Sequence, residues 1–263
     1  MHPIERLRWV ARSTGEEPDG LAREVAVALA DFADDPASLL TACRRLMERH
    51  PTSGPVWWVC GRTLSSPDPE DEVWRCLERL DRDPTMDDLS FALADGATVV
   101  VVGWSERLGP ALARRGDLSV RVLDVEGDGA GFARLLDRSG VTAVDVDVAA
   151  LSGAVTSADL VLLDAAVVGP DALLAAPGSH AAAALAHTAG LPVWAAVGEG
   201  RLLGARLWDR ARSLIDQRAG GRLDLGMDVV PLALLDRLAV PTGVAEVADA
   251  LASVEVVDAT ELG

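Results

Sequence analysis

The stretch that decides the fold runs from Ala158 to Gly198 and reads ADLVLLDAAVVGPDALLAAPGSHAAAALAHTAGLPVWAAVG. It contains a buried apolar strand at Leu160–Leu163, a long loop of small and turn-forming residues, an alanine-rich helix at Ala181–Thr188 and a second apolar strand from Pro192. A strand, loop, helix and strand in this order form one unit of a parallel sheet. Such sheets bind their ligands beside the carboxyl ends of strands. The loop after the first strand is therefore the first candidate for a functional site.

The chain on either side of this unit divides into two parts, which meet near residue 85. The first part has apolar residues at helical spacing and no two-residue alternation, whereas the second alternates apolar, β-branched runs with helices. The sequence therefore predicts an α/β fold, with a helical N-terminal domain over residues 1–85 and a Rossmann-like, doubly wound parallel sheet over 86–263. The predicted N-terminal helices are Ile4–Arg12, Leu21–Phe32, Ser38–Arg49, Val56–Leu64 and Glu70–Arg82. The second part adds strands at Thr98–Val102, Ser119–Leu123, Val141–Val146 and Leu238–Val240, and helices at Leu89–Ala94, Arg107–Arg115, Gly129–Ser139, Arg201–Gln217, Pro231–Arg237 and Val244–Ala252.

The composition excludes several classes of chemistry. The chain has 263 residues, 49% of them hydrophobic, and a net charge of −17, because 41 acidic residues outnumber 24 basic ones. Such a negative field repels nucleic acid and anionic membranes, so we expect neither as a direct partner. The sequence contains no Lys, Asn or Tyr. A lysine Schiff base and a P-loop lysine are therefore excluded.

The cysteines and the N-terminus indicate the cellular compartment. Cys43, Cys60 and Cys76 are widely spaced and form no CxxC pair, which is typical of reduced thiols in a cytoplasmic protein. No His and Cys residues have the spacing of metal ligands, so we expect no metal, and we expect no cofactor. The N-terminus is too charged for a signal peptide, and no apolar run reaches the roughly 18 residues of a membrane span.

Four segments, in the same order, resemble a known family. The longest is the stretch Ala158–Ala195, and the others are HPTSGPVWWVCGRTL at His50–Leu64, DGATVVVVGWS at Asp95–Ser105 and MDVVPLALLDRLAVPTG at Met227–Gly243. Together they are similar to the superfamily of translation initiation factor 2B alpha, beta and delta subunits, which includes isomerases of methylthioribose 1-phosphate and ribose 1,5-bisphosphate. The resemblance covers nearly the whole chain. It implies a divergent, bacterial-type member that forms a homodimer through its Rossmann-like half.

The chain departs from these isomerases where their chemistry is expected. The resemblance implies a Cys just after the first strand and an Asp at the end of the strand in the opening unit. Together these groups move protons as an aldose phosphate becomes a ketose phosphate. This chain instead has Gly103-Trp104-Ser105 after the first strand, and the acidic position falls on Ala165.

Asp164 is the nearest acid to that position, and the sequence leaves its orientation open. A shift of one residue at a strand end turns a side chain to the other face. A slip of the loop at Gly169 or Pro170 would turn it back. The implied phosphate-binding Asn-Lys pair falls on Ala175 and Ala176, which weakens the grip on a phosphate.

The remaining polar residues define the candidate site. Gly178 and Ser179 open a helix whose free N–H groups can bind an anion, although Ser179 is equally explained as a helix cap. His180 beside them is a candidate acid or base, or alternatively an exposed helix residue. The candidate catalytic residues are Asp164 and His180, and the candidate ligand-binding residues are Gly103, Trp104, Ser105, Arg107, Gly178, Ser179 and His50, the last in place of an implied arginine.

These departures favour a protein without the isomerase activity of its relatives. We expect an initiation factor 2B-like regulatory or ligand- and protein-binding module, with a sugar phosphate or a nucleotide as the small ligand. The alternative is a sugar-phosphate (aldose–ketose) isomerase-like enzyme on an altered substrate. An unrelated metabolite-binding α/β protein is a third possibility.

Overall fold

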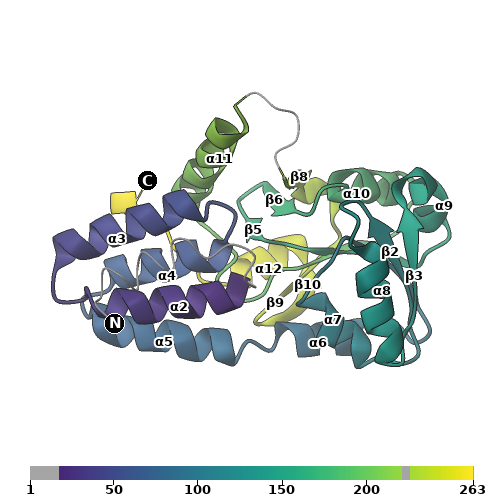
Figure 1. Ribbon diagram of the computed structural model, residues 1–263, viewed down its shortest axis with the longest axis horizontal. Helices are drawn as coiled ribbons and strands as arrows, with labels where there is room; N and C mark the ends of the chain where they lie inside the picture. Colours follow the sequence, from purple (N-terminus) through teal and green to yellow (C-terminus); the bar gives the residue numbers. More distant parts are fainter. Residues whose placement is uncertain (1–17, 221–225, 263) are drawn as a thin grey trace.

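The helical N-terminal module is present. The computed structural model describes residues 18–220 and 226–262, so the predicted helix at Ile4–Arg12 lies outside the described residues. Helix α11 (Ala205–Ala219), from the second half of the chain, lies beside the N-terminal helices (Figure 1). All five share one apolar core, which contains Trp57, Trp58 and Trp208. The N-terminal helices are α2 (Pro18–Ala30), α3 (Pro36–Arg49), α4 (Gly54–Ser65) and α5 (Pro69–Asp81).

Local signals in the sequence start two of these helices. The side chain of Asp35 accepts hydrogen bonds from the N–H groups of Ala37 and Ser38 at the start of α3, and Asp68 accepts one from Asp71 in α5. A proline follows each cap, at the helical position that needs no N–H partner. A cap of this kind typically stabilises a helix by about 1 kcal/mol. The sequence thus fixes where α3 and α5 begin.

Seven strands form the main sheet, in the order β10-β9-β7-β4-β1-β2-β3. All neighbours are parallel except β10, which runs antiparallel to β9. The central strand β1 is buried over nearly its whole length, as expected of a valine run between two layers of helices. The strands are β1 (Thr98–Val102), β2 (Ser119–Asp124), β3 (Thr142–Asp147), β4 (Leu160–Asp164), β7 (Val193–Ala196), β9 (Arg237–Val240) and β10 (Gly243–Glu246).

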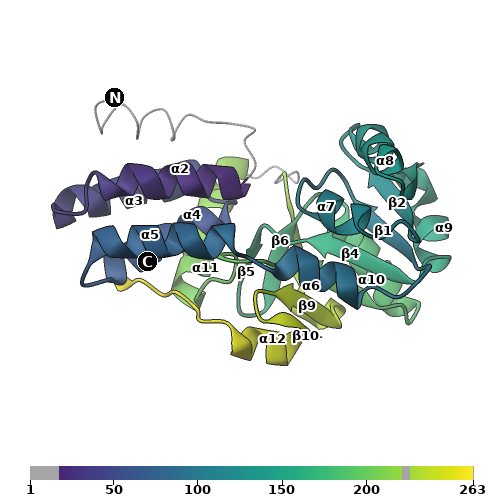
Figure 2. The same ribbon diagram turned by 90° about the horizontal axis from the view of Figure 1, so that it is seen from below.

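Helices cover both faces of the main sheet, which confirms the predicted doubly wound α/β fold. One face packs against α6 (Thr85–Ala92), α7 (Leu108–Ala113) and α8 (Gly129–Arg138). The other packs against α9 (Leu151–Thr156), α10 (Ser179–Thr188) and α12 (Val247–Ser253). In Figure 2, α6 continues from α5 and carries the chain from the helical module to the sheet.

The prediction of an irregular loop after β4 is wrong in one respect, because this segment contains a β-hairpin. Strands β5 (Val167–Val168) and β6 (Ala172–Ala175) pair antiparallel across a tight turn, in which the Gly169 N–H donates to the Ala172 carbonyl at 2.9 Å. Strand β8 (Asp228–Pro231) pairs with β6 and completes a second, three-stranded sheet. Strand β5 is only two residues long, so no alternation in the sequence marks it.

The C-terminal region also differs from its prediction. A helix at Pro231–Arg237 is wrong, because β8 ends at Pro231, a 3-10 turn covers Leu232–Leu234 and β9 begins at Arg237. The helix predicted from Val244 begins only at Val247, since the preceding residues form β10. Apolar residues in this short region face the core from strands and turns, so their spacing imitates a helix.

Candidate functional site

A cleft of about 510 Å³ opens at the carboxyl ends of β1, β2 and β4. The strand order reverses between β1 and β4, and ligands of doubly wound sheets bind at such a point. The turn after β1, the loop after β2 and the end of β4 line the cleft. Thr52, between α3 and α4, and Arg201, after β7, complete the wall. The cleft therefore lies where the helical module meets the sheet.

The turn after β1 brings Trp104 and Ser105 to the cleft. Gly103 makes this turn possible, because its φ of +66° is disfavoured for other residues. Trp104 leaves 41% of its surface exposed, and its ring centroid lies 5.5 Å from that of Phe132 on α8. Ser105 is buried, and its Oγ accepts the N–H of Leu108 at the start of α7 at 3.0 Å.

Asp164 points into the cleft, which resolves the orientation that the sequence leaves open. Its carboxylate accepts hydrogen bonds from Ser105 Oγ at 2.6 Å and from Arg107 Nη1 at 2.8 Å. The next residue, Ala165, is fully buried and continues the strand by donating its N–H to the Ala196 carbonyl. No slip of the loop is therefore needed to place the acid. Residues Trp104, Ser105, Arg107 and Asp164 meet in the cleft as candidates predicted together.

Two buried arginines form one wall of the cleft. The side chains of Arg107 and Arg201 are 8% and 1% exposed. Asp19, in the first turn of α2, holds Arg201 Nη2 at 2.6 Å and lies 3.9 Å from Arg107 Nε. Burial, and then the nearby charge of Arg107, lower the pKa of Arg201 below its ordinary value. The carboxylates around Arg201 therefore compensate its buried charge only in part.

Polar atoms in the cleft remain unsatisfied within the described chain. Arg107 Nη2 and Arg201 Nε are buried and have no hydrogen-bond partner among the described residues. The same holds for Asp128 Oδ1, on the opposite side of β1. Buried polar atoms without a partner are costly, so they accumulate where a ligand supplies the missing partner. These atoms make the cleft a candidate binding site.

Several predicted residues lie outside the cleft. His180 is exposed on α10, and its backbone N–H, not its ring, contacts Asp228. Gly178, with a φ of +89°, is the residue that caps α10, and Ser179 is the buried first residue of the helix. His50 ends α3, where its carbonyl accepts the indole N–H of Trp57 at 3.1 Å. None of these four predicted side chains lines the cleft in the described chain.

Sequence reasoning missed Arg201, Glu126 and Asp128, which do line the cleft. A signal for each was present. Arg201 follows the carboxyl end of β7, and the two acids follow the carboxyl end of β2. In a parallel sheet all these ends lie at one edge. Arg201 was placed at the start of a predicted helix, Arg201–Gln217, whereas the helix begins only at Ala205 and leaves Arg201 in the loop after β7.

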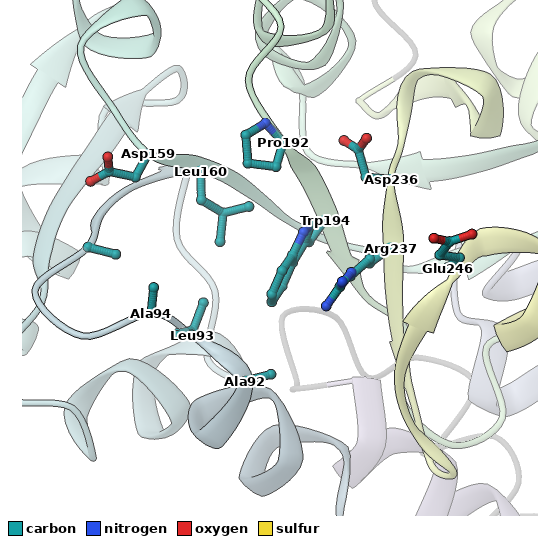
Figure 3. A pocket seen from close by; sticks show the side chains of 11 residues that line it. Ala92, Leu93, Ala94, Asp159, Leu160, Pro192, Trp194, Asp236, Arg237 and Glu246 are labelled. Carbon is teal, nitrogen blue, oxygen red and sulfur yellow. The ribbon is translucent and has the colours of Figure 1, made fainter.

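A second pocket, of about 680 Å³, lies at the opposite, amino edge of the main sheet, where β4, β7 and β9 begin (Figure 3). Trp194 and Arg237 lie side by side in it, with the guanidinium carbon 5.3 Å from the ring centroid. Asp159 accepts the N–H of Thr98 and Asp236 that of Val193, each at 2.8 Å. These carboxylates therefore hold the starts of β1 and β7.

By sequence, no protein-family model and no curated protein matches the chain. Solved structures match it by fold. Translation initiation factor eIF-2B from Pyrococcus horikoshii OT3 is 14% identical, with a TM-score of 0.75 over 94% of this chain and 98% of that one. The eIF2B beta subunit from Chaetomium thermophilum is 16% identical, with a TM-score of 0.75 over 99% and 93%. A chain of the tetrameric eIF2B-beta2-delta2 complex from C. thermophilum is 19% identical, with a TM-score of 0.71 over 95% and 92%.

The chain therefore has the fold of the initiation factor 2B subunits, over nearly its whole length. The predicted resemblance is confirmed at this level. Among the described residues, no helix is long and apolar enough to cross a membrane, and no cluster of His, Cys, Asp or Glu is arranged to hold a metal ion.

Proposed function

We propose that this protein is an initiation factor 2B-like module that lacks isomerase activity and acts by binding a small ligand or a protein partner in a regulatory role. The observation that carries the proposal is the hydrogen bonding of the Asp164 carboxylate. Its carboxylate is held by Ser105 Oγ and by the buried guanidinium of Arg107, at 2.6 and 2.8 Å. Neighbouring side chains therefore already occupy both oxygens of this carboxylate.

The other groups of the cleft do not supply the missing half of the chemistry. Aldose–ketose isomerisation needs an acid and a base placed across a carbonyl. In the described chain, no histidine or cysteine lines the cleft, and its ionisable groups are carboxylates and arginines. Cys43, Cys60 and Cys76 are buried in the helical module. The cleft thus keeps binding groups and lacks the cysteine that the resemblance implies as the partner of the acid.

An isomerase assay tests this proposal. Ribose 1,5-bisphosphate and methylthioribose 1-phosphate are each incubated with the full chain, and ketose formation is followed by NMR. We expect no conversion above the protein-free rate. Sustained turnover of either substrate would overturn the proposal.

A second function, an isomerase on an altered substrate, is favoured by the 2.6 Å contact between Asp164 and Ser105, which is short enough to pass a proton. Asp164→Asn removes the acid, whereas Asp171→Asn changes an exposed acid in the β5–β6 turn. Turnover of any aldose phosphate that is lost in the first variant and kept in the second would establish this function. Equal rates in both variants would exclude Asp164 as the base.

We also propose that the protein is a cytoplasmic homodimer, formed through its α/β half, and a bacterial-type member of the group it resembles. The similar chain from C. thermophilum is part of a tetrameric eIF2B-beta2-delta2 complex, which supports assembly. Size-exclusion chromatography with light scattering should give twice the chain mass of 27.5 kDa. A single-chain mass at micromolar concentration would contradict the dimer.

A further inference from the structure

The charges of the cleft are separated along the sheet. Arg107 and Arg201 lie on the side of β4 and β7, where they contact Asp164 and Asp19. Glu126 and Asp128 follow β2, on the other side of β1. The cleft therefore presents buried guanidinium groups at one end and carboxylates at the other.

The carboxylate end has no paired cation among the described residues. Glu106, Glu126 and Asp128 line the cleft, and none has an ion pair with another described residue. Asp128 precedes α8, where the helix dipole favours an acid, yet its side chain accepts no capping hydrogen bond. Its buried Oδ1 has no partner within the described chain. Helix capping therefore does not account for this carboxylate.

The arginine end has donor groups that no described residue accepts, although Asp164 and Asp19 pair with the two guanidinium groups. Arg107 Nη2 and Arg201 Nε are buried without a partner among the described residues, in side chains that are more than nine-tenths buried. Burial, followed by the nearby charge of Arg107, lowers the pKa of Arg201, against the opposing effect of Asp19 and Asp164. An incoming anion would supply the missing acceptors.

We propose that the cleft binds a small molecule that carries a protonated amine at one end and a phosphate or carboxylate at the other. The amine lies against Asp128 and Glu126, and the anionic group lies against Arg107 and Arg201. Exposed Trp104, at the same mouth, offers its ring face to the ammonium group. The volume of about 510 Å³ suits a ligand of this size.

This inference rests on the proposed ligand-binding role of the cleft and narrows it. A plain sugar phosphate satisfies only the arginine end and leaves the acids without a cation. A simple amine satisfies only the carboxylate end. A ligand with both groups satisfies both ends, so its two groups should each add to the affinity.

Matched ligands test the two ends separately, by isothermal titration calorimetry on the full chain. The probes are glucosamine 6-phosphate, N-acetylglucosamine 6-phosphate, which lacks the amine charge, and glucosamine, which lacks the phosphate. O-phosphoethanolamine and ethyl phosphate form a second pair without a sugar ring. We expect each amine-bearing phosphate to bind about tenfold tighter than its partner without the charged amine, and glucosamine to bind more weakly than its 6-phosphate.

A variant pair locates the amine end. Asp128→Asn should remove the preference for the amine, whereas Asp137→Asn, an exposed acid on the same helix, should keep it. Equal affinity for charged-amine and neutral probes, no binding of either amine-bearing phosphate, or an equal loss in both variants would overturn the inference. The isomerase assay stays independent, since turnover bears on the proposed function and not on the amine preference.

Discussion

The two edges of the main sheet carry pockets of similar size and different character. The pocket at the amino edge is larger, about 680 Å³ against about 510 Å³ for the cleft at the carboxyl edge. At the amino edge, the carboxylates of Asp159 and Asp236 accept hydrogen bonds from backbone N–H groups of neighbouring strands. Asp128 and Arg201 at the carboxyl edge keep buried atoms without partners in the described chain.

This difference shows that the volume of a pocket does not by itself identify the candidate binding site. Both edges of a parallel sheet leave backbone groups that need partners, and side chains at the amino edge satisfy them locally. At the carboxyl edge, charged groups from α2, β1, β4 and β7 converge without complete pairing. Incomplete pairing inside a folded protein costs free energy, so it favours the carboxyl edge over the amino edge as the candidate binding site.

The largest expected contrast comes from one arginine at each edge. Arg201→Ala removes a buried guanidinium together with its 2.6 Å ion pair to Asp19, so we expect a loss of about 3 kcal/mol in the free energy of unfolding. Arg237→Ala removes only an exposed cation over Trp194, which should cost about 0.5–1 kcal/mol. Urea denaturation followed by tryptophan fluorescence measures both.

Equal losses in these two variants would remove the distinction between a buried charge network and a surface contact. The slope of the denaturation curve serves as the control. If Arg201→Ala also lowered the slope, the variant would have changed compactness rather than stability alone.

Two glycines at opposite ends of β1 give a matched test. Gly96 and Gly103 have φ values of +68° and +66°, and an added Cβ at either would meet no atom closer than 3.8 Å. Each change to Ala should therefore cost about 1–2 kcal/mol from backbone conformation alone. Only Gly103→Ala, which moves the turn of Trp104, should weaken binding of glucosamine 6-phosphate. Calorimetry beside urea denaturation separates the effects, and equal binding losses would contradict the assignment of the site to the carboxyl edge.

A pair of acids, one at each edge of the sheet, should separate the effect on stability from the effect on ligand binding. Asp236→Ala loses the hydrogen bond to the Val193 N–H and should cost about 1 kcal/mol, with no effect on ligand binding. Asp128→Asn loses no capping hydrogen bond, and Oδ1 has no partner within the described chain, so the change should alter stability by less than about 0.5 kcal/mol. Thermal melts with and without glucosamine 6-phosphate report both quantities. A larger loss of stability in Asp128→Asn would show that this acid has a structural role.

The order of elements follows from the sequence because buried parallel strands leave continuous apolar runs. The prediction for Thr98–Val102 has the observed bounds, since every residue of that strand is apolar or β-branched. The β5–β6 hairpin was not predictable in this way. Its strands are two and four residues long and consist of Val, Ala and Leu, which suit a helix or a loop equally well.

The site was predictable only in part, for a related reason. Ser105, Arg107 and Asp164 follow strands that are neighbours in the sheet, so the strand pattern brings them together. Arg201 depends on Asp19, a contact between residues that lie 182 positions apart. No local pattern encodes such a pair. His180 was a candidate because it follows Ser179, but one residue of rotation on α10 turns it to solvent.

Thiol reagents should have the smallest effect on ligand binding, because the three cysteines lie in the core of the helical module and line neither pocket of the sheet. Burial raises the pKa of Cys60, and burial followed by the charge of Glu72 raises that of Cys76 to about 12. At pH 8 both thiols are therefore neutral in the folded chain and poor nucleophiles. We expect no labelling by Ellman's reagent and unchanged binding of glucosamine 6-phosphate, with all three cysteines reacting once guanidinium unfolds the chain.

The same thiols set the alkaline limit of stability. Because the folded pKa of Cys76 lies above its unfolded value of about 8.5, its contribution is complete below that pH and is lost as the pH rises toward 12. The chain has no Lys or Tyr, so few other groups titrate in this range. We expect the free energy of unfolding to fall by about 1.4 kcal/mol per pH unit for this thiol above about pH 9, and Cys76→Ala to remove that slope. An unchanged pH dependence of stability in Cys76→Ala would show that this thiol is not its cause. Labelling at pH 8 that weakens ligand binding would show that a cysteine of the helical module affects the cleft at the carboxyl edge.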